Sequence, residues 1–501
     1  MLTSFSQVRR KASLEEAVDA VVIGSGAGGS AIAAELAEGG RSVLVLEEGG
    51  DYTTKDFSLD APAMIRKLYR NAGTAVIRGT PNILFSEGRC VGGSTVINGG
   101  MSWRTPEKIL HKWQKDFDLS LSAESLDPVF EKVEKRVHVA AQDPESIGED
   151  SSLLKRGADA LSWKTVDAAR NQKHCAGSGN CAFGCPTGAK QSAALTYIPH
   201  LYSLGGRIFS GCRAEKILTR HGRAEGVTAR FFDPETSERG PALTVHAPIV
   251  VLAAGAIQTP ALLLRNRLAN SSRQVGRNFL CHPNAKVVAL FDRDVFAWKG
   301  TIQGYQVREF ADEGILITTT MVPPALLAMG LPYFGDASFE VMRDYNRMVV
   351  AGCLVEDTDV GRVSLDVFGE AKMRYDLCDR DARSLKRGVA LTAELFFAAG
   401  AKKILLPFDH LTSIDSPEDL KKIVAAPIPK DEIECLTVHA MGTCRMGRDP
   451  RSSVVNEWGE SHDVRGLYIA DASVFPGPIG VNPQISIMAL ATRTGQHILG
   501  S

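Results

Sequence analysis

The sequence predicts a mixed α/β protein in which a domain of alternating strands and helices is interrupted by a domain of mostly antiparallel sheet. Three observations support this fold class. Residues 18–47 contain an apolar run, a glycine-rich turn, a small-residue helix and a second apolar run, in that order. Glycine- and proline-rich motifs appear again near the other end of the chain, after Val438. Between them, residues 285–406 alternate apolar and polar side chains as half-exposed strands do, apart from a helical pattern in residues 381–399.

The composition of the 501-residue chain is that of an ordinary folded protein with more than one structural unit. Hydrophobic residues make up 44% and charged residues 23%, values that exclude disordered and fibrous classes. A net charge of −1 without a long basic run gives no reason to expect binding to nucleic acid or to an anionic membrane surface. The ten cysteines lack the density of a disulfide scaffold, which favours a cytoplasmic protein with reduced thiols.

The N-terminal segment shows no feature of a secreted protein. Arg9 and its basic neighbours are not followed by an apolar stretch, so no secretory signal is recognised. Ser13 and the acidic residues after it suit the capped start of a helix. Because the chain contains no run of about 18 or more apolar residues, we expect no transmembrane segment.

The first glycine-rich turn, Gly24-Ser-Gly26-Ala-Gly-Gly29, has the spacing of a dinucleotide-binding site. Such glycines, placed after a strand and at the start of a helix, permit a tight turn, close approach to a pyrophosphate and close packing of helix on strand. Glu47 ends the next predicted strand, about 20 positions later, where a carboxylate accepts a hydrogen bond from a ribose hydroxyl. This acid argues against a ribose 2′-phosphate, and the motif alone leaves FAD and NAD open.

Three later segments also have the density of special residues that a binding site requires. Residues 88–99 are rich in glycine and would bring the backbone close to a flat ligand. Residues 439–447 begin with a histidine and contain two glycines. Residues 467–483 contain an apolar run that ends near Asp471 and then an Asn-Pro step. Because proline is tolerated in the first turn of a helix, we expect a helix after Pro483.

In this order, these segments resemble the glucose–methanol–choline (GMC) oxidoreductases, a family of FAD-dependent enzymes. Residues 250–260 and 275–283 are also similar to family segments, and the resemblance covers almost the whole chain. It implies a discontinuous FAD-binding domain of Rossmann type, with an inserted substrate-binding domain built on an antiparallel sheet plus helices. The expected bounds are residues 15–284 for the first part of the FAD domain, with a helical and loop excursion at about 105–200, residues 285–429 for the substrate domain, and residues 430–501 for the second part of the FAD domain.

The resemblance also implies which residues would contact FAD. Some family members tether the flavin covalently through a histidine near the second motif, but no histidine lies in residues 88–106, so we expect FAD without that bond. The implied contacts are Gly24, Gly26 and Gly29 to the pyrophosphate, Glu47 to the adenosine ribose, Ala214 to the adenine, Asp471 to the ribityl–phosphate part, and Gly93, Ser94, Asn98, Gly99, Asn482 and Pro483 to the flavin ring.

His439 matches the family's catalytic histidine, and Asn482 matches its partner, which is histidine or asparagine in the family. Oxidation of an alcohol by flavin moves a hydride from carbon to flavin N5 and removes a proton from oxygen. An imidazole suits proton removal because its pKa lies near the operating pH, whereas an amide can only position the substrate. The resemblance therefore implies an enzyme that oxidises a primary or secondary alcohol to an aldehyde or ketone, with His439 as the general base.

The resemblance leaves a non-redox alternative, a hydroxynitrile lyase, which would keep both FAD and the histidine. An NAD dehydrogenase is disfavoured by the flavin-contacting segments, and a non-enzymatic FAD-binding protein by the pair of His439 and Asn482. The substrate stays open among steroids, long-chain alcohols, sugars and aromatic alcohols. Oxygen, a quinone or a redox protein could accept the electrons, and the oligomeric state is open too. Met321, Phe334 and Phe339 are apolar candidates for the lining of a substrate pocket.

Three cysteines, Cys175, Cys181 and Cys185, lie close together in a glycine-rich segment that ends in Cys-Pro. Such loops hold iron–sulfur clusters in some proteins, including some sugar dehydrogenases of the GMC family. Those enzymes have adjacent cysteines at the start of the loop, whereas here Cys175 is followed by Ala176. We therefore favour reduced thiols that pack a tight loop, and we expect no metal.

Overall fold

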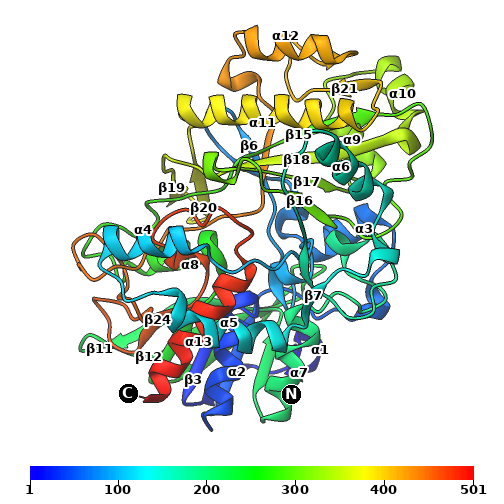
Figure 1. The fold of residues 1–501 in the computed structure, drawn as a ribbon. Helices are drawn as coiled ribbons and strands as arrows, with labels where there is room; N and C mark the ends of the chain where they lie inside the picture. Colours follow the sequence, from blue (N-terminus) through cyan, green and yellow to red (C-terminus); the bar gives the residue numbers. More distant parts are fainter. Residues whose placement is uncertain (501) are drawn as a thin grey trace.

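A computed structural model describes residues 1–500, and its lower half in Figure 1 is built on a six-stranded parallel sheet. Two central strands, β3 and β4, are buried along their whole length, as apolar strands covered by helices are. In spatial order the strands are β1 (Leu2–Thr3), β10 (Arg207–Ser210), β4 (Val43–Glu47), β3 (Ala20–Ile23), β14 (Ile249–Leu252) and β24 (Leu467–Ile469).

Helix α2 (Ala27–Glu38) joins β3 to β4, so the strand, glycine turn, helix and strand predicted for residues 18–47 are confirmed. This helix is rich in Ala and Gly, which lets it pack closely against α13 (Gln484–Gly500). Helix α13 begins directly after Pro483, as predicted. The first and last motifs of the chain therefore lie side by side, although they are far apart in the sequence.

A second sheet lies at the edge of this domain, and it corrects one expectation. Its strands, in spatial order, are β11 (Cys212–Arg220), β12 (Arg223–Phe232), β13 (Arg239–His246) and β2 (Ser13–Ala17). The helix start expected at Ser13 was wrong, because these residues form strand β2 and pair in parallel with β13. Pairing with a strand from a distant part of the chain outweighs the local capping signal.

The upper half of the molecule contains a larger sheet that is antiparallel apart from one parallel pairing, between β23 and β6. This confirms the mostly antiparallel sheet predicted from the alternating pattern. In spatial order its strands are β5 (Ala75–Ile77), β6 (Ile83–Phe85), β23 (Cys435–Thr437), β15 (Asn284–Leu290), β18 (Met348–Val355), β17 (Ile315–Thr320), β16 (Tyr305–Val307) and β8 (Thr165–Asp167), with β21 (Lys403–Leu405) beside β15 and β22 (Ser413–Ile414) beside β21.

Helix α11 (Asp379–Ala398), close to the helix expected at residues 381–399, covers one face of this sheet. Its apolar side packs with residues of β15, β17 and β18 into a core that is separate from the core around the parallel sheet. Four strands of the sheet, β5, β6, β8 and β23, come from outside residues 285–429. The sheet therefore interleaves segments from across the chain, and the expected domain bounds stay a prediction.

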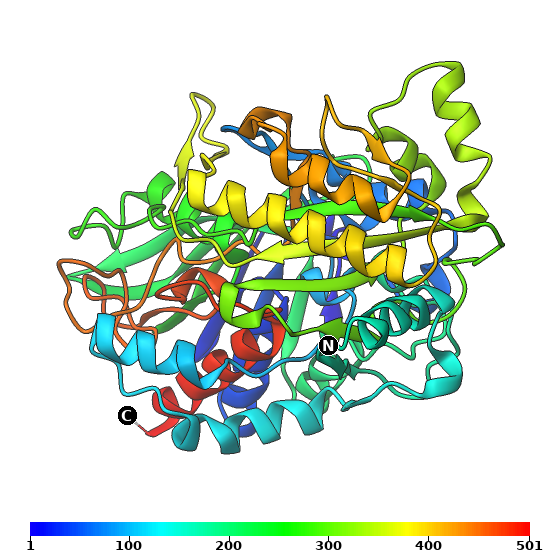
Figure 2. The same ribbon diagram turned by 45° about the horizontal axis from the view of Figure 1, so that its top comes forward.

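Further helices surround these two halves. Among residues 1–500, no helix has the length and apolar character to cross a membrane. Figure 2 shows the light-green segment that carries α9 and α10 standing out from one side of the larger sheet. The remaining elements are α1 (Phe5–Val8), α3 (Ala61–Leu68), α4 (Glu107–Phe117), α5 (Ala123–Arg136), α6 (Glu149–Ala160), α7 (Tyr197–Ser203), α8 (Gly255–Asn266), α9 (Pro324–Met329), α10 (Asp336–Met342), α12 (Leu420–Ala425), β7 (Val139–Ala141), β9 (Ala169–Asn171), β19 (Arg362–Leu365) and β20 (Ala371–Arg374).

Candidate functional site

The first glycine turn places backbone N–H groups where a phosphate could bind. Gly24 has a φ of +100°, which favours glycine, and Gly26 is the N-cap of α2 without a side-chain cap. A Cβ on Gly29 would lie 1.9 Å from the Gly24 carbonyl oxygen, so helix and strand approach as closely as glycine allows. The free N–H groups and the positive end of the α2 dipole make this turn an anion-binding site.

The second glycine segment, residues 88–99, lies directly against the first. A Cβ on Gly93 would lie 2.8 Å from Gly26 Cα, and the Gly92 N–H donates to Ser25 Oγ at 3.0 Å. The two segments thus form a backbone cradle that a side chain would fill, and this fits a cofactor with a pyrophosphate. Ser94 is exposed, and its Oγ accepts a hydrogen bond from the Gly88 N–H at 2.9 Å.

Glu47 supports the first glycine turn from the end of β4. Its Oε2 accepts hydrogen bonds from the Ser25 N–H at 3.0 Å and from Ser25 Oγ at 2.7 Å, while Oε1 accepts from the Gly49 N–H at 2.8 Å. Burial raises the pKa of the Glu47 carboxyl above its ordinary value. Ala214 lies on β11, which contacts β4, so both residues expected near the adenosine belong to neighbouring strands. Their contacts with the cofactor stay predictions.

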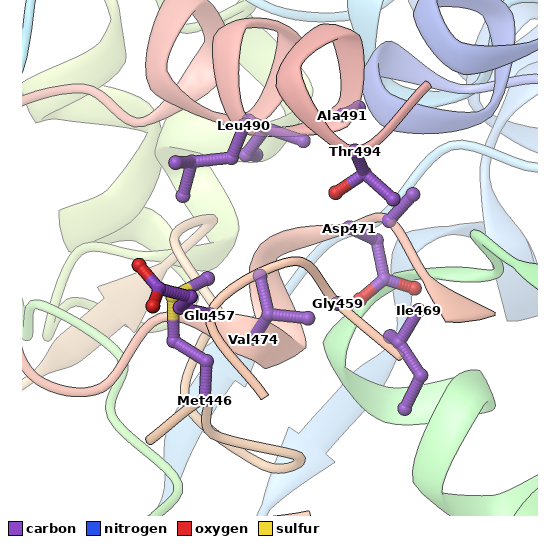
Figure 3. Close-up of a pocket in the computed structure, with 11 residues that line it drawn as sticks. Met446, Glu457, Gly459, Ile469, Asp471, Val474, Leu490, Ala491 and Thr494 are labelled. Carbon is purple, nitrogen blue, oxygen red and sulfur yellow. The ribbon is translucent and has the colours of Figure 1, made fainter. Parts of the chain in front are cut away.

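Asp471 connects the end of β24 to the start of α8. Its Oδ2 accepts from the Gly255 N–H at 2.9 Å and from Thr259 Oγ1 at 2.5 Å, and its Oδ1 accepts from the Ser473 N–H at 2.8 Å. Asp471 lines a cavity of about 10 Å³, and Figure 3 shows it beside Thr494. That cavity has room for about one water molecule, so it is too small to be the substrate site.

His439 and Asn482 are brought together by the ends of two distant segments. His439 follows β23, and its backbone N–H donates to Thr437 Oγ1 at 3.2 Å. Asn482 precedes α13, and its Nδ2 lies 3.3 Å from His439 Nε2. Because an amide Nδ2 can only donate, Nε2 is the acceptor and is unprotonated in this arrangement. Burial lowers the pKa of His439 to about 4, which agrees with a neutral imidazole.

His282 is a residue of this site to which the sequence assigned no role. Its ring stands perpendicular to that of His439, with the centroids 5.7 Å apart, and its Nε2 accepts from the Gly480 N–H at 3.3 Å. Burial, with His439 as a lesser cause, lowers the pKa of His282 well below its ordinary value. His282 therefore lies against His439 and also holds the loop that carries Asn482. The signal that could have found it is its place in the family-like segment 275–283.

The backbone around His282 is held in an unusual conformation. His282 has a φ of +45°, in the left-handed region that a histidine seldom adopts. Asp357 stabilises this turn because its Oδ2 accepts from the Cys281 N–H at 2.6 Å and the His282 N–H at 3.2 Å. Burial raises the pKa of Asp357 to about 7. Backbone strain of this kind is concentrated at functional sites.

Gln484 is a second residue that the sequence did not single out. Its Oε1 accepts a short hydrogen bond from the Asn98 amide, which links residues 93–99 to the segment of Asn482 and Pro483. Two polar atoms beside this link, Gln484 Nε2 and Asn482 Oδ1, are buried without a hydrogen-bond partner. The expected flavin-ring residues on both segments are therefore gathered at one place. The position of Gln484 directly after Asn482-Pro483 could have identified it.

The cysteine-rich loop packs behind residues 93–99. The Lys190 ammonium, at the end of this loop, is buried and donates to the carbonyl oxygens of Val96 at 2.7 Å and Asn98 at 2.8 Å. Arg170 Nη2 donates to Cys181 Sγ at 3.3 Å. Among residues 1–500, no group of three or more His, Cys, Asp or Glu side chains is arranged to hold a metal ion. The loop thus supports the backbone of the segment that is expected to face the flavin.

Two of the three apolar residues expected to line a pocket are exposed to solvent. Phe334 is 88% exposed and Phe339 is 74% exposed, on the segment that stands out from the sheet. Met321, in contrast, packs with Leu326 against a small core that includes Val96 and Ile97. The apolar pattern of this segment therefore does not predict which residues face a substrate.

Comparisons with known proteins agree with this architecture. Residues 65–284 and 357–491 match two family models that are both described as GMC oxidoreductase, and residues 22–60 match a model described as an NAD(P)-binding Rossmann-like domain. The chain is 37% identical over 476 residues to an uncharacterised GMC-type oxidoreductase of Mycobacterium tuberculosis, covering 94% of this chain and 74% of the relative. It is 28% identical over 510 residues to a long-chain-alcohol oxidase of Arabidopsis thaliana, covering 96% of this chain and 68% of the relative.

Solved structures show the same fold. Pyridoxine 4-oxidase from Mesorbium loti superposes with a TM-score of 0.72 at 16% identity, covering 96% of this chain and 99% of the other. A formate oxidase superposes with a TM-score of 0.71 at 16% identity, covering 97% of this chain and 99% of the other. At such low identity this likeness concerns the fold and not the substrate.

Proposed function

Because this chain belongs to the GMC oxidoreductase family and is an FAD-dependent oxidoreductase, we propose that it oxidises a primary or secondary alcohol to an aldehyde or ketone. The observation that carries the proposal is the contact between His439 Nε2 and Asn482 Nδ2 at 3.3 Å. This contact lies beside the segment that contains Asn98, which is the segment expected to pass the flavin ring. When bound, FAD supplies the acceptor for the hydride.

The cradle of the two glycine segments is where the cofactor would be held. The N–H groups at the start of α2 would bind its pyrophosphate, because Gly26 and Gly93 leave the space in front of them free of side chains. Gly99, Ser94, Asn98 and Pro483 would lie along the flavin ring, as the family resemblance implies.

His439 would remove the proton from the substrate hydroxyl. The imidazole is neutral at pH 7, since burial lowers its pKa to about 4, and Nε2 is a hydrogen-bond acceptor. A substrate hydroxyl would donate to Nε2 in place of the Asn482 amide. The Asn482 amide would then donate to the substrate oxygen and stabilise the negative charge that develops on it. General base catalysis of this kind contributes typically about 10²–10⁴-fold to the rate.

The rate of flavin reduction by an alcohol under anaerobic conditions tests this proposal. We expect His439→Ala to slow the reduction by about 10²–10⁴-fold while the protein retains FAD. His111→Gln is the matched control, because His111 is an exposed histidine on α4, and it should leave the rate unchanged. An unchanged rate in His439→Ala would remove His439 from the role of base.

The same measurement distinguishes the proposed alcohol oxidation from the non-redox alternative. A hydroxynitrile lyase would cleave a cyanohydrin while the flavin spectrum stays oxidised with every alcohol. Wild-type enzyme that contains FAD and is bleached by no primary or secondary alcohol would therefore overturn the proposed oxidation. A panel drawn from steroids, long-chain alcohols, sugars and aromatic alcohols covers the substrate classes that the sequence leaves open.

A further inference from the structure

The larger sheet presents one face to α11 and the other to the catalytic side of the molecule. Along β15, Ala285 and Val287 point into the core that α11 completes. Side chains alternate between the two faces of a strand, so Asn284 and Lys286 point to the opposite face. Figure 1 shows that this opposite face looks down toward the parallel sheet and the helices packed on it.

A polar row crosses this second face. The strand register places Lys286 of β15 opposite Gly352 of β18, Gly352 opposite Thr318 of β17, and Thr318 opposite Gln306 of β16. We call these four residues the polar row. Their neighbours on three of the strands, Val287, Ala351 and Ile317, belong to the α11 core, which confirms that the polar row points away from α11.

Several polar atoms on and beside the polar row lack partners. Gln306 is only 2% exposed, and its Oε1 is buried without a hydrogen bond. Asn284 Oδ1 is also buried and unpaired, and its amide lies over Gly352, where a Cβ would be 2.6 Å from that oxygen. Among residues 1–500, Lys286 makes no hydrogen bond, and its ammonium interacts electrostatically with the Glu434 carboxylate; burial lowers the pKa of this ammonium to about 8 although Glu434 opposes the shift.

The polar row adjoins the catalytic residues. Asn284 pairs with Leu436 of β23, the strand that leads directly into His439. On the other side, Gln303 precedes β16, and its Oε1 lies 1.8 Å from where a Cβ on Gly99 would be. Gln303 Oε1 is another buried atom without a hydrogen-bond partner. Unpaired acceptors and donors therefore extend from the sheet to the flavin-facing segment and the base.

We propose that the substrate is a polyhydroxylated, sugar-like alcohol and that the polar row binds its hydroxyl groups. Buried polar groups are unfavourable without hydrogen-bond partners, and an apolar alcohol would leave the amide oxygens of Gln306 and Asn284 unpaired. Hydroxyl groups both donate and accept, so they can pair with amide oxygens and with an ammonium. This inference rests on the proposed alcohol oxidation, whose substrate class it specifies.

Anaerobic reduction of the flavin in the holoenzyme by two sets of probes tests the inference. One set contains hexoses, pentoses and cyclitols, and the other contains 1-dodecanol and cyclohexanol. We expect the second-order rate constant to be higher for at least one member of the first set than for either member of the second. A site built to bind hydroxyls rejects analogues that lack them by up to about 10⁴-fold. Faster reduction by the apolar alcohols would overturn the inference.

Two variants of the polar row test whether these residues bind the hydroxyls. Gln306→Leu and Lys286→Met should each lower the rate constant for the preferred polyol by about tenfold, the size of one hydrogen bond, and leave that for cyclohexanol unchanged. Lys402→Met is the control, because Lys402 is a surface residue with an ion pair to Asp292. An equal loss with both alcohols, or no loss in either variant, would contradict binding by the polar row. If Gln306→Leu or Lys286→Met does not fold, the same measurement is made on Thr318→Val in its place.

Calorimetric binding of the same probes separates this inference from the proposed function. Binding of a polyol that weakens in Gln306→Leu supports the polar row even if no alcohol reduces the flavin, and then only the proposed oxidation fails. Absence of polyol binding at millimolar concentration overturns the polar row as a substrate site, whatever the flavin does.

Discussion

Burial determines the charge of the two histidines at the site, because it lowers the pKa of each imidazole. His439 and His282 face each other across 5.7 Å, and burial lowers the pKa of both. A charged imidazole would be disfavoured in this environment, so both rings stay neutral at pH 7. In the proposed mechanism, a neutral His439 accepts a proton from a donor held against it, and Asn482 and the loop anchored by His282 would provide that geometry.

The rate constant kcat/KM for the alcohol should show the lowered pKa of His439. We expect it to be constant from pH 8 down to about pH 5 and to fall below that, as His439 becomes protonated with a pKa of about 4. Flavin reduction measured across this range checks the prediction. A decline already centred near pH 6.5 would show that the imidazole is not desolvated.

Asp357 should make the protein less stable as pH rises through the acidic range. Its folded-state pKa of about 7 lies above the ordinary value of 3.8, so the folded state binds more protons between those values and loses stability as pH rises through them. Asp357→Asn keeps an oxygen to accept from the Cys281 and His282 N–H groups. We expect this variant to have a higher melting temperature than wild type at pH 8 and a smaller difference at pH 5.

Thermal unfolding of the two proteins at both pH values measures this effect. Asp376→Asn is the control, because Asp376 is an exposed carboxylate whose replacement should not alter the pH dependence. A lower melting temperature of Asp357→Asn at pH 8 would mean that the Asp357 charge stabilises the turn at His282.

At the scale of elements, the glycines of α2 have different physical roles that substitutions can separate. A Cβ on Gly26 would meet only Gly93 Cα, at 3.9 Å, so alanine fits the cofactor-free protein. A Cβ on Gly28 would lie 1.7 Å from the Ala470 carbonyl oxygen. Ala470 directly follows β24, so this backbone atom cannot shift without disturbing the parallel sheet. One glycine therefore keeps space for a ligand, and the other keeps space for the backbone.

Gly26→Ala should weaken FAD binding at least about tenfold with no loss of apoprotein stability, because the new methyl group enters the pyrophosphate site. Gly28→Ala should lower the free energy of unfolding by about 1–3 kcal/mol, as overpacking does. Fluorescence titration with FAD and urea unfolding of the apoprotein measure the two effects. Gly500→Ala, at an open position near the chain end, is the control. Equal FAD affinity in wild type and Gly26→Ala would exclude the cradle as the cofactor site.

The elements also show where local patterns predict structure and where they fail. Residues 18–47 were predicted correctly because strand, turn and helix are specified within a short stretch by apolar periodicity and glycine spacing. Ser13 was assigned to a helix start and forms strand β2 instead. Its partner β13 lies more than 200 residues away, so no local signal could reveal the pairing.

At the scale of the whole molecule, the larger sheet contains strands from both inside and outside the expected substrate domain. Its outer strands β5, β6, β8 and β23 belong to segments that lead into or out of the cofactor-binding half. Glu35 and Glu38 of α2 form ion pairs with Lys132 of α5. The helical segment at about residues 105–200 therefore also contacts the helix that follows the first glycine turn. The substrate domain is therefore an insertion in sequence but not a detachable unit in space.

A fragment of residues 285–429 should consequently not fold by itself. Without β8, the strand β16 would expose an unpaired edge, β15 would lose its pairing with β23, and the sheet would lose four of its strands. We expect near-ultraviolet circular dichroism of the fragment to lack the signals of packed aromatic side chains and its thermal unfolding to lack a cooperative transition. A cooperative transition in the fragment would show that the predicted bounds describe an independent domain.

The sequence by itself determined the motifs and their order, and it predicted their roles: a glycine turn for a pyrophosphate, a histidine for a proton and an amide to position a substrate. These depend on contacts within about 30 residues or on a resemblance that covers the chain. Only the tertiary structure decided that Asn482 lies 3.3 Å from His439, that His282 stands beside both, and that Phe334 and Phe339 face solvent. It also decided the polar row, because strand register joins residues that are distant in the sequence, and a shift of one residue would turn Lys286 and Gln306 to the other face.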